Sequence, residues 1–123
     1  MNIAGREQPR VALLYCVPLL CEAVAAALDS IAEVQAFPAR RGDTEGLLRS
    51  LRPDAVIVDS AEEADEARRW AKLYDLPLIH VSLRERKIRV LRDGAWDETT
   101  GTTTEAIRNV LAGSIYGRRR DAT

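Results

Sequence analysis

The chain alternates short, continuous apolar runs with longer segments whose apolar residues recur at helical spacing. The apolar runs are VALLY at 11–15, AVIV at 55–58 and LIHV at 78–81. Runs of this length predict strands buried on both faces, because a half-exposed strand alternates apolar and polar residues. Buried strands separated by helical segments predict strand-helix-strand units, with a parallel sheet covered by helices on both faces.

Prolines help to define the predicted elements. Helices are predicted over three segments with helical spacing of apolar residues: 18–31, 43 or 44 to 52, and 62–74. Pro18 suits the first turn of the first helix. The segment 33–39, EVQAFPA, is a weaker strand, and Pro38 places it at a sheet edge because proline cannot donate to a strand ladder.

The segment from Leu83 to Gly101 fits two structures. Ser82 and Glu85 have the spacing of a helix capping box and precede an apolar stripe, which favours a short helix ending at Gly94. The alternative is a hairpin of KIRVLR and AWDETT with Asp93-Gly94 as its turn, a pair that favours type I′ geometry. We prefer the hairpin, because its β-branched and aromatic residues suit strands and a helix here would leave no good fifth strand.

Composition limits the functions that such a fold can serve. The 123 residues are 46% hydrophobic and 30% charged, and no apolar run approaches the length of a membrane span. A formal net charge of -1 gives no general attraction for nucleic-acid phosphates. Two cysteines without an export signal predict a cytoplasmic location. We expect one domain at 10–117 between an N-terminal tail, 1–9, and a basic tail, 118–123, without membrane or direct nucleic-acid binding.

Motifs of common enzyme classes are missing. YCVPLL, after the first strand, is no glycine-rich phosphate loop, and the sequence has no G-x-S-x-G elbow. Cys16, Cys21 and the single histidine, His80, are too few for a zinc site. Cys16, at a strand end, could be a reactive thiol, but we expect it to be a small buried residue. We therefore expect a protein that is not an enzyme and has no cofactor or metal.

Five segments, in order, resemble the receiver domain of two-component response regulators: VALLYCVPLLCEAVAAAL, RPDAVIVD, LPLIHVS, VLRDGAW and TEAIRNVLAG. RPDAVIVD resembles the third strand, whose final aspartate accepts the phosphoryl group, and LPLIHVS the fourth strand with its terminal serine or threonine. The resemblance spans Arg10 to Gly113 and makes Asp59 the equivalent of the phosphoacceptor. It implies an α/β fold, a three-layer α-β-α sandwich with a mostly parallel five-stranded flavodoxin-like sheet, its fourth helix short or replaced by a hairpin.

The residues that assist the phosphoacceptor in receivers are changed here. The resemblance places Tyr15 and Cys16 where receivers hold magnesium with acidic residues, and magnesium needs hard oxygen ligands. It also implies a lysine at the end of the fifth strand, yet Lys87 comes too early and no Lys-Pro follows Ser82. Nothing then neutralises a phosphoryl group approaching the negative Asp59. Asp59 is expected instead to be a strand-end residue that can cap the helix starting near Glu62.

Three functions fit this altered site. We favour a degenerate receiver that acts without phosphorylation, through a protein partner or as a homodimer, in bacterial transcriptional or signal-transduction control. The alternatives are a receiver still phosphorylated on Asp59, and a sensor whose emptied pocket at Tyr15, Cys16, Asp59 and Ser82 binds a small molecule. An apolar stripe on the last helix is either an interface or packs on the sheet. The residues of this stripe, with a tyrosine beside it, are Ile107, Val110, Leu111, Ile115 and Tyr116.

Overall fold

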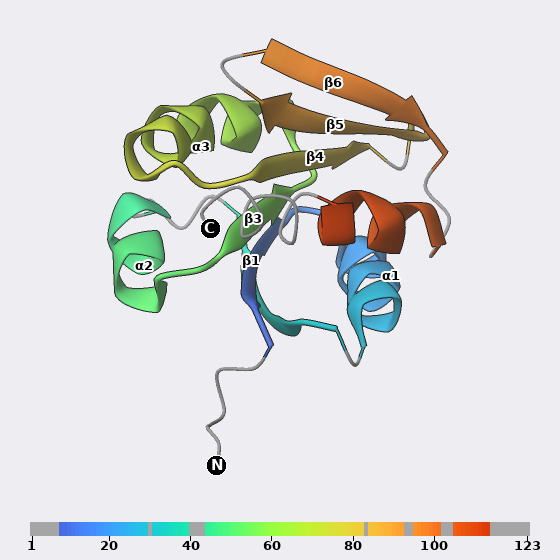
Figure 1. Cartoon of the computed structure of the whole chain (residues 1–123), viewed down its shortest axis with the longest axis horizontal. Coiled ribbons are helices and arrows are strands. Elements are labelled where there is room, and N and C mark those ends of the chain that lie inside the picture. Colours follow the sequence, from blue (N-terminus) through green and yellow to red (C-terminus); the bar gives the residue numbers. More distant parts are fainter. Residues whose placement is uncertain are drawn as a thin grey trace.

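Strands and helices alternate along most of the chain in the computed structural model (Figure 1), which describes residues 8–29, 31–39, 44–82, 84–92, 95–101 and 105–113. The elements are β1 (Arg10–Tyr15), α1 (Pro18–Leu28), β2 (Glu33–Pro38), α2 (Thr44–Leu51), β3 (Ala55–Val58), α3 (Ala61–Tyr74), β4 (Leu78–Ser82), β5 (Lys87–Arg92) and β6 (Ala95–Thr100). Residues 105–113 are also helical and are called the last helix below. None of the described helices is long and apolar enough to cross a membrane.

The sheet has a parallel part and an antiparallel part. Its order is β2-β1-β3-β4-β5-β6, and β1, β2, β3 and β4 run parallel. β5 pairs antiparallel with β4, and β6 antiparallel with β5. The predicted α/β class and the edge position of β2 are confirmed. The prediction of a mostly parallel five-stranded sheet is wrong, because the described sheet has six strands and is mixed. β5 follows β4 after a short turn without a crossover helix, and a strand that returns in this way runs antiparallel.

The hairpin predicted between Leu83 and Gly101 is formed by β5 and β6, and the helical alternative is wrong. The capping-box hydrogen bond does form, since the Ser82 Oγ accepts the backbone N–H of Glu85 at 3.2 Å. The chain nevertheless makes a turn at 84–86 and continues as β5. Pairing with β4 buries Ile88 and Val90 in the core. The hydrophobic effect of this burial outweighs the local helix signal.

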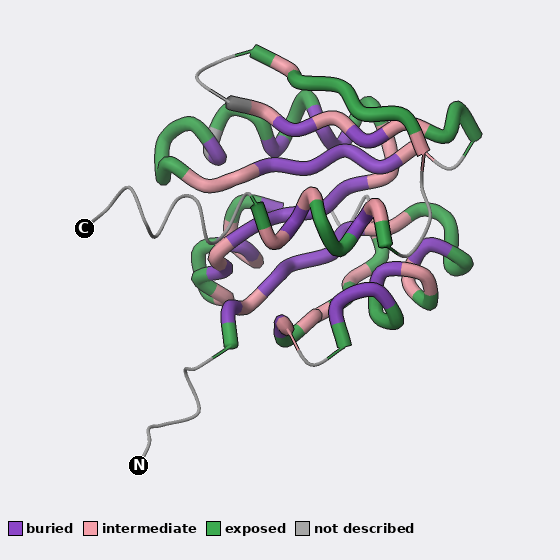
Figure 2. Tube along the Cα trace, turned by 45° about the vertical axis from the view of Figure 1, so that its right-hand side comes forward, coloured by how far each residue is buried: buried purple, intermediate pink, exposed green. Residues whose placement is uncertain are grey.

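Helices cover both faces of the sheet; β3 is buried along its whole length, and β1 and β4 are buried except at their ends (Figures 1 and 2). α1 and the last helix pack on one face, which we call the α1 face, and α2 and α3 pack on the other, the α3 face. The α1-face core includes Leu13, Leu20, Val24, Ile57, Ile79, Ile107 and Leu111. The α3-face core includes Leu14, Leu48, Val58, Ala67, Ala71 and Leu78. Successive residues of β1 and β3 contribute to opposite cores, as expected for doubly covered strands.

Several predictions concern residues outside the described ranges. They are the Asp93-Gly94 turn, the basic tail, most of the N-terminal tail, and the last two residues of the candidate interface, Ile115 and Tyr116.

Candidate functional site

The Asp59 carboxylate connects the end of β3 to the start of α1. The backbone N–H of Cys16 donates to both carboxylate oxygens, at 2.8 and 2.9 Å, and that of Val17 donates to Oδ2 at 2.8 Å. β1 and β3 are neighbouring parallel strands, so their carboxyl ends meet at one edge of the sheet. α1 has no side-chain cap of its own at its N-cap residue, Val17. Asp59 therefore supplies the acceptor and the negative charge that stabilise a helix N-terminus.

The expectation that Asp59 caps the helix starting near Glu62 is wrong, because α3 is capped by a different residue. Ser60 is the N-cap of α3, and its Oγ accepts the backbone N–H of Glu63 at 3.3 Å. Asp59 thus caps α1, the helix that follows β1, although it is 42 residues along the sequence from Val17. A carboxylate has about four acceptor sites, and backbone N–H groups use three of them here.

Tyr15 ends β1 and Cys16 follows it, at the edge of the sheet where Asp59 lies, but neither residue lines the cleft that contains Asp59. Tyr15 is partly buried against the α1-face core. Cys16 is exposed, so the prediction that it is a small buried residue is wrong. In α1, burial and then the nearby Asp59 raise the pKa of the Cys21 thiol, which favours its protonated form. Within the described ranges, no three or more His, Cys, Asp or Glu side chains are grouped so that they can hold a metal ion.

A half-open cleft of about 340 Å³ lies at the carboxyl ends of β3 and β4. Its lining residues come from the end of β3, the start of α1, the start of α3, β4, β5 and the turn between β4 and β5. They are Val17, Asp59, Ala61, His80, Ser82, Arg84, Glu85 and Arg89. The fold thus brings Asp59 and Ser82 together in one cleft, whereas Tyr15 and Cys16 do not line it. Besides Asp59, three charged side chains of the turn after β4 and of β5 line the cleft, and they are Arg84, Glu85 and Arg89.

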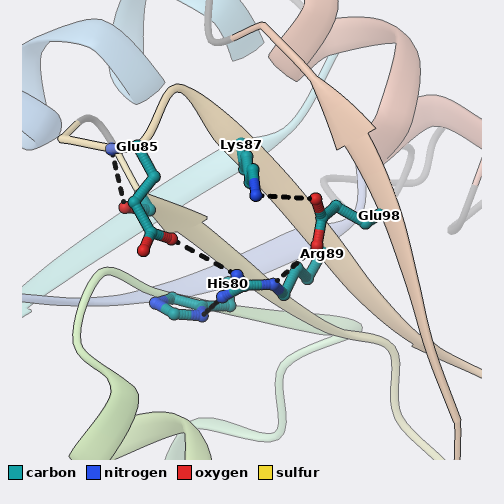
Figure 3. Close-up of polar contacts among 6 residues, drawn as sticks. His80, Glu85, Lys87, Arg89 and Glu98 are labelled. Atoms are coloured by element: carbon teal, nitrogen blue, oxygen red, sulfur yellow. Dashed lines mark hydrogen bonds and ion pairs between the residues drawn. The ribbon is translucent and has the colours of Figure 1, made fainter.

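His80, Arg89 and Glu98 stand directly opposite one another on β4, β5 and β6 (Figure 3). Arg89 is the centre of this row, which we call the cross-strand row. Its Nη1 lies 3.5 Å from His80 Nδ1, its Nε donates to Glu98 Oε1 at 3.2 Å, and its Nη2 donates to Glu85 Oε1 at 3.3 Å. Lys87 Nζ lies 3.1 Å from Glu98 Oε2. The row ties the hairpin to the parallel part of the sheet through side chains as well as backbone.

The surroundings of the cross-strand row set the charge of its members. Burial, and then the positive charge of Arg89, lower the pKa of the His80 imidazole. Neutral His80 can accept from Arg89 at Nδ1, and it then carries its proton on Nε2. Hydrogen bonds from Lys87 and Arg89 lower the pKa of the Glu98 carboxyl, which keeps it ionised.

Sequence reasoning missed the cross-strand row. The only available signal was the opposite charge of the two predicted hairpin strands, KIRVLR and AWDETT. That signal indicates pairing but does not define the register, and register decides which residues meet.

The apolar stripe of the last helix packs on the sheet. Ile107 and Leu111 are 2% and 1% exposed and belong to the α1-face core, and Val110 is partly buried against it. A partner therefore cannot contact Ile107 or Leu111 unless the last helix leaves the sheet. The large apolar side chains that are exposed in the described structure lie at the start of α1 and the end of α3, and they are Val17, Leu19, Leu73 and Tyr74.

Comparison of the chain with models of protein families, with curated proteins and with solved structures finds no match. The geometry around Asp59 and the adjacent cleft is therefore the basis on which a function can be assigned.

Proposed function

We propose that this chain is a receiver-like regulatory domain that acts through contacts with a protein partner, without phosphoryl transfer, in bacterial transcriptional or signal-transduction control. The five segments that resemble receiver domains support this assignment. The parallel order β2-β1-β3-β4, with helices on both faces, also agrees with a flavodoxin-like three-layer sandwich, in which ligands bind outside the carboxyl ends of the strands. In this proposal the β5–β6 hairpin replaces the fourth helix and the final parallel strand.

The hydrogen bonds on the Asp59 carboxylate carry the proposal. Attack on a phosphoryl donor needs an accessible oxygen and a cation that offsets the added negative charge. Both Asp59 oxygens already accept backbone N–H groups, at 2.8 to 2.9 Å. The neighbouring Tyr15 and Cys16 offer a phenol and a thiol where a magnesium site needs carboxylates. Asp59 is thus better suited to holding α1 against β3 than to accepting a phosphoryl group.

The test is incubation of the full chain with acetyl phosphate and magnesium, followed by intact-mass spectrometry. We expect no phosphoryl adduct under conditions that modify an authentic receiver domain in a parallel reaction. Beryllofluoride with magnesium should also leave the amide NMR spectrum of the chain unchanged. An adduct that forms on the wild-type chain and not on Asp59→Ala would instead establish Asp59 as a working phosphoacceptor.

The partner contacts of this domain are expected to exclude the buried residues of the last helix. Because Ile107 and Leu111 already pack in the core, homodimerisation through them would require a second set of contacts for the sheet face that they cover. Size-exclusion chromatography with light scattering should therefore give a monomeric mass. If the wild-type mass were dimeric and Val110→Asp made it monomeric, the interface would lie on the last helix.

A further inference from the structure

The cleft beside Asp59 contains two arginines that play no part in the hydrogen bonds of the Asp59 carboxylate. Arg84 is exposed in the turn after β4, and none of the ion pairs or hydrogen bonds described above involves it. The orientation of the Arg89 guanidinium is fixed by the protein, since its Nε donates to Glu98 and its Nη1 lies beside His80. A guanidinium held in this way is preorganised, so less conformational freedom is lost when a ligand binds to it.

The charges of the lining decide which class of ligand fits. Arg84 and Arg89 are positive, Asp59 and Glu85 are negative, and His80 is the remaining titratable group of the lining. The charge of Asp59 is compensated by backbone N–H groups at the start of α1. With Asp59 compensated, Arg84, Arg89 and Glu85 leave one net positive charge in the lining. A ligand with one negative charge neutralises it, whereas a dianion such as phosphate leaves an excess negative charge.

We propose that this cleft binds a small monocarboxylic acid, with the carboxylate on Arg84 and Arg89 and the apolar part against Val17 and Ala61. Guanidinium groups match the planar carboxylate and can hold it through two parallel N–H bonds. Val17 is 44% exposed, so an apolar ligand would cover a surface that water now contacts. The volume of about 340 Å³ is near the lower limit for small-molecule sites, which favours a ligand of few atoms.

The carboxylate of the ligand would take the place of the Glu85 carboxylate as the acceptor of the Arg89 Nη2 hydrogen bond. Glu85 Oε1 accepts from Arg89 Nη2 at 3.3 Å, and the Glu85 side chain is 53% exposed. Exposed ion pairs of this kind are weak, so an incoming carboxylate can take over the Nη2 donor. This binding function is additional to the proposed regulatory role, and it holds whether or not the chain has a protein partner.

The test is an NMR titration of the full chain, at constant ionic strength, with butyrate, benzoate, inorganic phosphate and butylammonium as separate probes. Both carboxylates should produce saturable shifts at the amides of Ala61, Ser82 and Glu85. Millimolar affinity is expected for ligands of this size. Phosphate should bind more weakly than the carboxylates, and butylammonium should produce no saturable shift.

Two arginine variants separate a specific site from general attraction. Arg84→Gln should weaken butyrate binding about tenfold, the effect of losing one charge-assisted hydrogen bond. Arg86→Gln is the matched control, because Arg86 lies in the same turn but does not line the cleft, and it should change the affinity less than about twofold. Neither variant should alter the melting temperature appreciably. The proposal is overturned by equal effects of the two variants, by tighter binding of phosphate, or by the absence of saturable shifts with both carboxylates.

Discussion

Replacing Asp59 by alanine tests whether this aspartate stabilises the fold by holding the start of α1 to the end of β3. Alanine removes the acceptor of two backbone N–H groups, those of Cys16 and Val17, and removes the negative charge at the start of α1. Hydrogen bonds to a charged group contribute about 1.5 to 3 kcal/mol each, and the smaller value suits contacts that are solvent exposed, so we take about 3 kcal/mol for the two as the upper estimate. Water can replace the carboxylate because these contacts are solvent exposed, and a typical helix-cap loss of about 1 kcal/mol is the lower estimate.

The expected loss of about 1 to 3 kcal/mol is measurable by urea denaturation followed by circular dichroism. For a chain of 123 residues it corresponds to a melting temperature lower by roughly 4 to 12 °C. Hydrogen exchange should accelerate at the amides of Cys16 and Val17 in particular, since these two donors lose their acceptor. Asp59→Asn, which keeps one carbonyl oxygen but loses the charge, should fall between wild type and Asp59→Ala.

Asp65→Ala is the matched control for the charge change. Asp65 is an exposed residue of α3, and its replacement should alter stability by no more than about 0.5 kcal/mol. If Asp59→Ala were as stable as this control, or more stable than wild type, Asp59 would not be a residue that stabilises the fold. A gain in stability is the behaviour expected of a residue retained for chemistry at a cost to the fold.

Three further predictions concern the cross-strand row and the last helix. His80 has a folded-state pKa below its ordinary value of 6.5, so the unfolded chain takes up this proton first as the pH falls. Stability from this group is complete above pH 6.5 and declines as the pH falls below that value towards the folded pKa; urea midpoints of His80→Gln should lack this component. Glu98→Gln should lower the melting temperature slightly at low salt and hardly at all at high salt, because its partners Lys87 and Arg89 are partly exposed. Ile107→Ala should cost about 2 to 4 kcal/mol by leaving a cavity in the α1-face core; an unchanged stability together with a changed oligomeric mass would show that Ile107 lies in an interface.

The elements of the parallel part could be predicted from the sequence alone. Apolar runs such as AVIV and the helical spacing after Pro18 are local properties, and β3 and α1 form where these patterns predict them. Asp59 was recognised as a strand-end residue for the same reason. Its partners were not predictable, because they lie 42 and 43 residues away and are brought to it only by the pairing of β1 with β3.

The antiparallel part was decided by tertiary structure. The sequence from Ser82 onward carried both a capping-box signal and a hairpin signal, and burial of Ile88 and Val90 against the core favoured the hairpin. Only the resulting register places Arg89 between His80 and Glu98, and only the packing of the sheet brings Arg84, Glu85 and Arg89 to the cleft beside Asp59. Local patterns therefore determined the strands and helices of the parallel part. The directions of the last two strands and the chemistry of the cleft depended on contacts between residues far apart in the chain, which no local pattern encodes.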